Sequence, residues 1–251
     1  MPMRIIGWVV VAGAFLSLGA NARGESLREF LQSVESAATP TVPLRADGTI
    51  EISSDAGSIR DRIALVLRSP GDIYIELRDD GTRALILDDG SRAVRAAKGS
   101  GADELAGDAV LAGSDFTRED LQPLRVARFS DMRISDDSNG ELTAALFPTK
   151  SQYTLLAMTF DRQKKVPIKT IYYRDTLNNA VKMERFGGYE QVGGKWLPAT
   201  ISMESFRLKT HTTLTLHWTA NPPLSPGLFE ADSLSRPSQL EWPASAVTMG
   251  K

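Results

Sequence analysis

The amino-acid sequence predicts a mainly β protein, in which a strongly curved antiparallel sheet, an unclosed half-barrel, wraps around an N-terminal helix and short plug helices. Short segments of alternating polar and apolar residues recur from residue 62 to residue 219. Turn pairs such as Asp-Gly and Asn-Gly separate these segments, as they do in antiparallel hairpins. A single segment with helical period precedes them and is suited to cover the open side of a curved sheet.

The first 22 residues have the features of a cleavable secretory signal peptide. Arg4 supplies a positive charge, an apolar stretch runs from Ile5 to Leu18, and Ala20-Asn21-Ala22 has the small residues of a cleavage site. An uncleaved anchor is the weaker alternative, because a membrane-spanning helix needs roughly 20 apolar residues. No cysteine is present to carry an acyl chain. We therefore expect cleavage after Ala22, a periplasmic location and a single domain over residues 23–251.

Residues 26–37 are predicted to form one amphipathic helix. Ser26 and Glu29 have the spacing of a capping box, in which each side chain bonds a backbone N–H of the other. Apolar residues follow at helical spacing, at positions Leu27, Phe30, Leu31 and Val34. One side of the helix should therefore pack against the sheet.

Period-two alternation predicts an antiparallel meander over most of the chain. The first strands are expected around Arg62–Arg68, residues 73–77 and residues 85–87, with turns between them. Later strands are expected at about 125–135, 141–147, 153–161, 167–175, 180–187, 195–207 and 210–219.

Two stretches interrupt the alternation and predict the short helices. One helix is expected near residues 103–111, and Thr117 with Asp120 has the spacing of another helix start. Asp115 lies just ahead of this start and is expected to accept backbone N–H bonds as a cap. Near the end of the chain, Ser225-Pro226 predicts a short helix that carries Leu228 and Phe229.

The composition excludes several classes of function. A net charge of −2 argues against nucleic acid as a partner, because phosphate-binding proteins usually carry a basic surface. The absence of cysteine excludes disulfides and thiolate metal sites. A hydrophobic content of 42% is sufficient for a large core, so stability must come from packing.

Few residues suit catalysis or metal binding, and we expect no enzyme activity, metal or cofactor. Motifs of serine hydrolases and phosphate-binding loops are missing. His211 and His217 lie in one predicted strand, about 20 Å apart at roughly 3.3 Å per residue, which is too far to share a metal. The segment from Ser135 to Leu146 imitates a calcium loop. Leu146 stands where the bidentate glutamate belongs, however, which favours a hairpin turn.

The segment from Leu111 to Leu121 carries a family resemblance. It reads Leu-Ala-Gly-Ser-Asp-Phe-Thr-Arg-Glu-Asp-Leu and resembles the G-S/T-D-F-S-x-E-D-L signature of LolA-like outer-membrane lipoprotein-sorting proteins. Weaker matches follow in the family's order at Tyr153–Phe160, Val166–Lys169, Val181–Met183, Gly194–Pro198, Ile201–Met203, Thr212–Leu216, Leu228–Phe229 and Leu234. The resemblance covers about residues 105–234, and it depends on the order and spacing of these motifs together.

The resemblance implies an unclosed β-barrel around helices, with an apolar cavity for acyl chains and no catalytic residues. The signature residues are expected to be structural, namely Gly113, Ser114, Asp115, Phe116, Glu119, Asp120 and Leu121. From the strand and helix patterns we expect the lipid-binding cavity to be lined by Phe30, Leu65, Leu67, Ile73, Ile75, Leu214 and Leu216.

The function implied is that of a periplasmic carrier, which moves a lipid or a lipoprotein acyl chain between the inner and outer membranes. Its expected partners are the acyl chains and an inner-membrane exporter, and its membrane contact is expected to be transient. A lipid sensor module of the same fold is the alternative. An outer-membrane barrel is disfavoured, because strands such as Arg62–Arg68 and Arg174–Glu184 have charges at positions of both faces.

Overall fold

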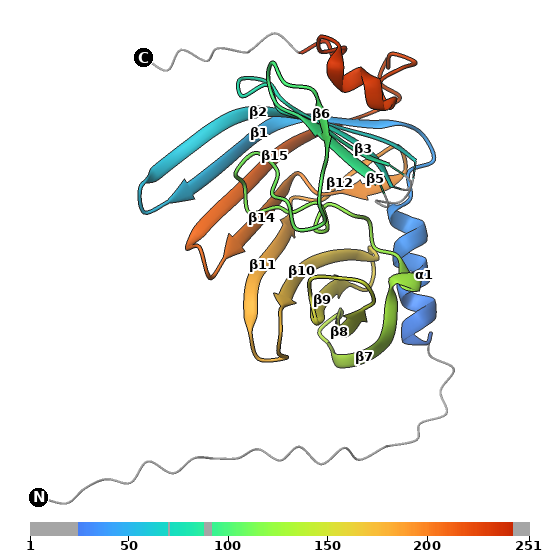
Figure 1. Cartoon of the computed structure of the whole chain (residues 1–251). Helices are drawn as coiled ribbons and strands as arrows, with labels where there is room; N and C mark the ends of the chain where they lie inside the picture. Colours follow the sequence, from blue (N-terminus) through green and yellow to red (C-terminus); the bar gives the residue numbers. More distant parts are fainter. Residues whose placement is uncertain (1–24, 70, 88–91, 243–251) are drawn as a thin grey trace, which may run out of the picture.

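The computed structural model describes residues 25–69, 71–87 and 92–242. The predicted signal peptide and its cleavage site lie outside these residues. In the described part of the chain, thirteen antiparallel strands form one strongly curved sheet that does not close on itself (Figure 1). The predicted fold class, a mainly β protein with a strongly curved, unclosed antiparallel sheet and an N-terminal helix, is thereby confirmed.

The sheet consists of two meanders, which are joined by pairing between β1 and β15. The first meander contains β1 (Leu44–Ser54), β2 (Gly57–Ser69), β3 (Asp72–Leu77), β4 (Arg83–Leu87), β5 (Arg92–Ala96) and β6 (Ala102–Glu104). The second contains β7 (Phe129–Ser138), β8 (Glu141–Pro148), β9 (Leu155–Asp161), β10 (Val166–Tyr173), β11 (Ala180–Gly187), β14 (Thr200–Ser205) and β15 (Thr210–Ala220). Strands β12 (Glu190–Val192) and β13 (Lys195–Leu197) form a separate ribbon.

Two local predictions have different outcomes. The strand expected at 195–207 is divided into β13 and β14, because Pro198 lies between them and lacks the N–H that a sheet interior requires. The calcium-like segment is a hairpin turn between β7 and β8, as predicted. Its tip residues Asn139 and Gly140 have φ angles of 54° and 79°, which a tight two-residue hairpin turn requires.

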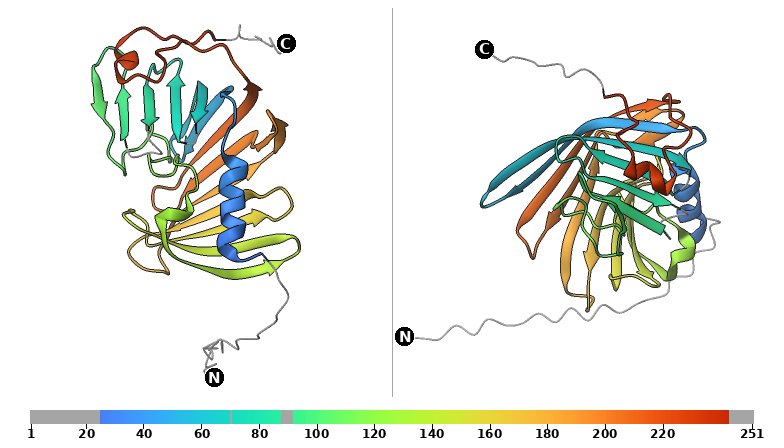
Figure 2. Two further views of the ribbon diagram at one scale, coloured as in Figure 1. Left: turned by 90° about the vertical axis from the view of Figure 1, so that its right-hand side faces the viewer. Right: turned by 45° about the horizontal axis from the view of Figure 1, so that its top comes forward.

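Helix α1 (Leu27–Ala38) confirms the predicted N-terminal helix and its capping box. The Ser26 N–H donates to Glu29 Oε2 at 2.8 Å, and the Glu29 N–H donates to Ser26 Oγ at 3.3 Å. The helix lies across the concave side of the second meander (Figure 2). Its Phe30 ring meets Phe160 of β9 edge-on, with ring centroids 5.8 Å apart, so the apolar side of α1 is buried.

The chain after β15 covers the convex side of the first meander (Figure 2). The helix expected at Ser225–Phe229 is wrong. Those residues form turns, and a 3₁₀ helix follows at Ala231–Ser235. Leu228 and Phe229 nevertheless pack against β2, β3 and β4. The Arg83 guanidinium fastens the segment by donating to the carbonyl of Leu234 at 2.6 Å.

Residues 105–125, here called the plug segment, lie on the concave side of the sheet. The helices expected near 103–111 and from Thr117 are wrong, because these residues form β6 and a series of turns. The Leu111 N–H donates to the Phe116 carbonyl at 2.9 Å, and Gly113 between them has a φ of 75°. A left-handed residue at this position ends helical geometry. The plug remains in place because Leu111 and Phe116 are buried in the main core. It leads into the 3₁₀ helix at Val126–Arg128.

Candidate functional site

The concave side of the sheet, α1 and the plug segment together enclose a cavity of about 940 Å³. This volume lies within the range of small-molecule sites, about 300–1,000 Å³. Much of the lining is apolar and includes Val34, Leu156, Met158, Phe160, Ile201 and Trp218. Such a surface favours an apolar ligand.

The structure brings four of the seven expected cavity residues to this cavity. Leu65, Leu67, Ile73 and Leu214 line it. Phe30, Ile75 and Leu216 are not among its lining residues. Phe30 packs on Phe160, while Ile75 and Leu216 are 1% and 0% exposed and belong to the solid core.

The signature residues form the plug wall of the cavity and the turn behind it. Phe116, Glu119, Asp120 and Leu121 line the cavity. Gly113 is exposed, and Ser114 Oγ accepts a hydrogen bond from the Phe116 N–H at 3.2 Å. Glu119 accepts the Gln152 N–H at 3.2 Å, which connects the plug to the segment before β9.

Asp115 does not cap a helix, so the interpretation from sequence is wrong. Its carboxylate accepts the hydroxyls of Thr210 and Thr212, the latter at 2.8 Å, and its own N–H donates to Thr212 Oγ1 at 3.0 Å. Thr212 is fully buried on the concave side of β15. The buried hydroxyl and carboxylate satisfy each other, and they bind the plug to β15 instead of to a helix end.

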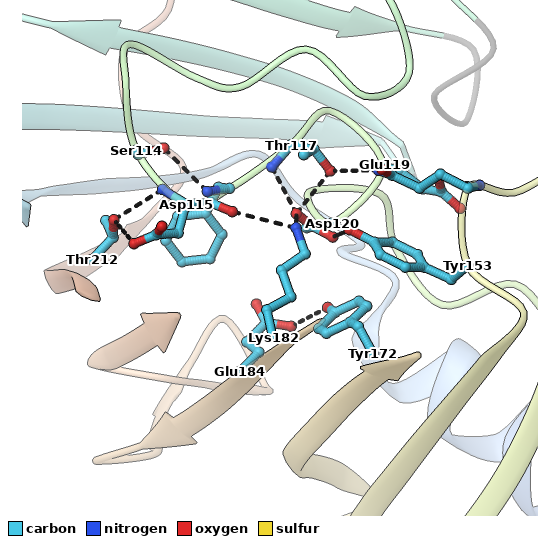
Figure 3. Close-up of polar contacts among 12 residues, drawn as sticks. Ser114, Asp115, Thr117, Glu119, Asp120, Tyr153, Tyr172, Lys182, Glu184 and Thr212 are labelled. Atoms are coloured by element: carbon cyan, nitrogen blue, oxygen red, sulfur yellow. Dashed lines mark hydrogen bonds and ion pairs between the residues drawn. The ribbon is translucent and has the colours of Figure 1, made fainter. Parts of the chain in front are cut away.

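Asp120 and Lys182 form a buried ion pair between the plug and β11 (Figure 3). The Asp120 side chain is 0% exposed and also accepts the Thr117 N–H at 2.6 Å and the Tyr153 hydroxyl at 2.8 Å. Lys182 Nζ donates further to the Asp115 carbonyl at 3.3 Å. A buried charge pair is stable only when its polar atoms are satisfied in this way. The pair thus positions the plug over the sheet.

Glu184 is a cavity residue that the sequence interpretation missed. It lines the cavity at 5% exposure, and the Tyr172 hydroxyl donates to its Oε2 at 2.6 Å (Figure 3). Burial raises the pKa of Glu184 to about 8, and the charge of Asp120 also favours the protonated form. Burial likewise raises the pKa of Tyr172 well above its usual range. At neutral pH both groups therefore carry protons.

One signal in the sequence could have identified this inward charge. Lys182, Glu184 and Phe186 alternate along β11 and therefore share one face. Phe186 and Glu184 line the cavity.

The described residues offer little support for a metal centre. They contain no group of three or more His, Asp or Glu side chains that could hold a metal ion. His211 and His217 are both exposed, and His211 Nε2 lies 2.9 Å from Thr213 Oγ1.

Among the residues that the structure describes, no helix has the length and apolarity needed for a membrane span.

Three solved structures have this architecture at low sequence identity. A Vibrio parahaemolyticus domain described as an outer membrane lipoprotein-sorting protein aligns with a TM-score of 0.72 at 16% identity, over 83% of this chain and 98% of that one. A DUF1329 family protein from Desulfovibrio piger aligns with a TM-score of 0.72 at 18% identity, over 82% of this chain and 97% of that one. A LolA superfamily protein from Nitrosomonas europaea aligns with a TM-score of 0.64 at 13% identity, over 80% of this chain and 96% of that one.

Sequence comparison identifies the family. No curated protein matches the chain significantly. A family model with the description "Uncharacterized protein" matches residues 102–236, which is more than half of the chain and includes the plug, the signature and the second meander. The chain therefore belongs to the family that this model describes, and its fold is that of the LolA-like lipoprotein-sorting proteins.

Proposed function

We propose that this protein is a periplasmic carrier, which holds an acyl chain of a lipid or lipoprotein in its concave cavity. The observation that carries the proposal is the apolar cavity of about 940 Å³ beneath the plug. The fold, which it shares with a domain described as an outer membrane lipoprotein-sorting protein, supports the same role. The carrier would move its cargo between the inner and outer membranes without a catalytic step.

The energy of such binding would come from burying hydrocarbon. Each methylene group transferred from water contributes about 0.8 kcal/mol, and the surplus over the entropy cost of association is the affinity. Cargo exchange also requires a lining that can reach water. Leu67 and Ile73 meet this requirement because both line the cavity and are only half-buried.

The pair Ile73 and Ile75 provides the sharpest test of the cavity. Both lie on the same face of β3, but Ile73 lines the cavity while Ile75 is 1% exposed in the core. We expect Ile73→Glu to stay folded and to lose affinity for a fluorescent acyl-chain probe at least about tenfold, because a charge in the cavity costs several kcal/mol when cargo excludes water. Fluorescence titration and circular dichroism measure these two effects.

Ile75→Glu is the matched control and should unfold, because its carboxylate would enter a solid core. A wild-type protein that binds no acyl probe would contradict the carrier proposal. So would an Ile73→Glu protein that binds the probe as the wild type does. A protein that binds lipid but transfers none between vesicles would favour the sensor module.

The hairpin tips at one end of the sheet support the transient membrane contact. Pairing along β1, β15, β14 and β11 places the β1–β2, β14–β15 and β10–β11 turns next to one another (Figure 1). Large apolar side chains are exposed there, with Ile59 at 71%, Leu177 at 55% and Leu208 at 65%. The β14–β15 tip alternates apolar and basic residues, Phe206-Arg207-Leu208-Lys209, all of them exposed. This chemistry suits an anionic lipid surface.

We expect the double variant Phe206→Ser/Leu208→Ser to bind anionic vesicles at least about tenfold more weakly, because two inserted side chains are lost. Co-sedimentation with phosphatidylglycerol vesicles measures this. Ile134→Ser is the control, since Ile134 is 49% exposed on β7, away from these tips. Equal binding by the double variant and the control would show that the tips do not contact the membrane.

A further inference from the structure

We propose that Thr170 and Glu184 form a polar subsite in the cavity, which binds the carbonyl of an acyl ester or acyl amide. This inference rests on the proposed carrier function and adds the chemical class of the group that joins the acyl chain to its lipid or protein. Hydrocarbon alone would not use the subsite.

The geometry of the two strands brings the pair together. Thr170 of β10 and Glu184 of β11 are direct partners in the antiparallel register, so their Cβ atoms are about 4.5–5.5 Å apart on one face. Both residues line the cavity. Thr170 is 1% exposed and Glu184 is 5% exposed, so both side chains are shielded from bulk water.

The hydroxyl of Thr170 is an unexplained polar group at this position. Among the described residues it has no hydrogen-bond partner, although it is fully buried. Buried polar atoms in folded proteins are nearly always paired, so an unpaired one at a cavity calls for a partner from outside the chain. A ligand carbonyl would accept its proton.

The carboxyl of Glu184 offers a second donor. Within the described residues its hydrogen-bond partner is the Tyr172 hydroxyl, which donates to Oε2. Oε1 therefore remains to carry the acid proton toward a ligand. Burial keeps that proton in place at neutral pH, since it raises the pKa of Glu184 to about 8.

The charges around Glu184 leave the subsite without a net charge. Lys182 on its own strand and Asp120 of the plug both influence its pKa, and they neutralise each other as an ion pair. Tyr172 of β10 and Tyr189 after β11 face it as protonated phenols, because burial raises the pKa of both. Two uncharged donors in an apolar cavity match a carbonyl oxygen, whereas a carboxylate would meet unfavourable desolvation.

The experiment compares three competitors of equal chain length, a methyl ester, an N-methyl amide and a hydrocarbon, for displacement of a fluorescent apolar probe. Glu184→Met should weaken the ester and the amide about tenfold, the effect of one lost hydrogen bond to a buried group. It should leave the hydrocarbon unchanged. Thr170→Val should act in the same direction. Whichever of the ester and the amide binds wild type more tightly identifies the linkage that the subsite prefers.

Controls separate this inference from the carrier proposal. Thr159→Val is the control for Thr170→Val. Thr159 is buried but does not line the cavity, and its hydroxyl is already paired with that of Thr143 at 3.0 Å. This variant should therefore bind all three competitors as the wild type does. Glu184→Gln keeps a donor and should bind the ester at every pH, whereas wild-type affinity should fall above about pH 8 as the acid ionises. If Glu184→Met and Thr170→Val weaken all three competitors equally or none of them, the subsite is wrong while the cavity stands. If wild type binds no competitor, the carrier proposal itself fails.

Discussion

Replacing Gly48 by alanine is expected to unfold the protein or to lower its Tm by roughly 10 °C or more. Gly48 lies in β1 and pairs with Leu216 of β15 on one side and Ile63 of β2 on the other. A Cβ atom there would lie 1.8 Å from the Thr215 carbonyl oxygen, a backbone atom that cannot move aside alone. The two strands would have to separate, and their pairing joins the two meanders. We expect a cost above about 3 kcal/mol, at the upper end of the effects of overpacking.

Gly101→Ala is the control, because a Cβ at Gly101 meets no atom within 4 Å and its φ is not in the left-handed region. This variant should melt within about 2 °C of wild type, as surface substitutions do. Differential scanning calorimetry compares the three proteins. A Gly48→Ala protein that melts like Gly101→Ala would show that β1 and β15 are not held as closely as the structure has them.

Replacing Lys182 by methionine is expected to cost about 3–5 kcal/mol, because it leaves the buried Asp120 carboxylate without its counter-charge. The Lys182 side chain is 9% exposed and that of Asp120 is 0% exposed, so water cannot take the place of the ammonium group. The ammonium group also lies 5.3 Å from the Tyr153 ring centroid, a contact that is lost as well. The plug should detach first, because this pair joins it to β11. Urea unfolding gives the free energy.

Two further variants make this expectation specific. Lys165→Met removes a lysine of a surface pair, 3.4 Å from Glu25 with both side chains more than a third exposed, and should cost at most about 1 kcal/mol. Lys182→Met/Asp120→Asn removes both charges and should recover part of the loss. A double variant no more stable than Lys182→Met would show that packing, and not the unpaired charge, dominates.

Local signals were sufficient for the predicted elements that the structure confirms. The capping box at Ser26 and the apolar spacing on α1 need no distant residue, since the contacts they form lie within a few positions of each other. The β7–β8 hairpin likewise follows from Asn139-Gly140, because few other pairs adopt its positive φ angles so readily.

The plug segment shows where local signals fail. Thr117 and Asp120 have helix-start spacing, and Asp120 does accept the Thr117 N–H. The same carboxylate also pairs with Lys182 of β11 and accepts the hydroxyl of Tyr153, which lies just before β9. These contacts hold a turn where the sequence suggested a helix, because two polar partners from distant segments outweigh a weak local preference.

The sequence by itself determined the mainly β class, the N-terminal helix, most hairpins and the apolar character of the concave side, since all of these depend on local period and turn residues. The tertiary structure decided three things. It joined the meanders through β1 and β15, which are more than 150 residues apart in the chain. It divided the expected lining into cavity residues such as Ile73 and core residues such as Ile75, which share a face of β3. It also turned the charges of β11 inward, because the buried partners that make Lys182 and Glu184 tolerable, Asp120 and Tyr172, come from other segments of the chain.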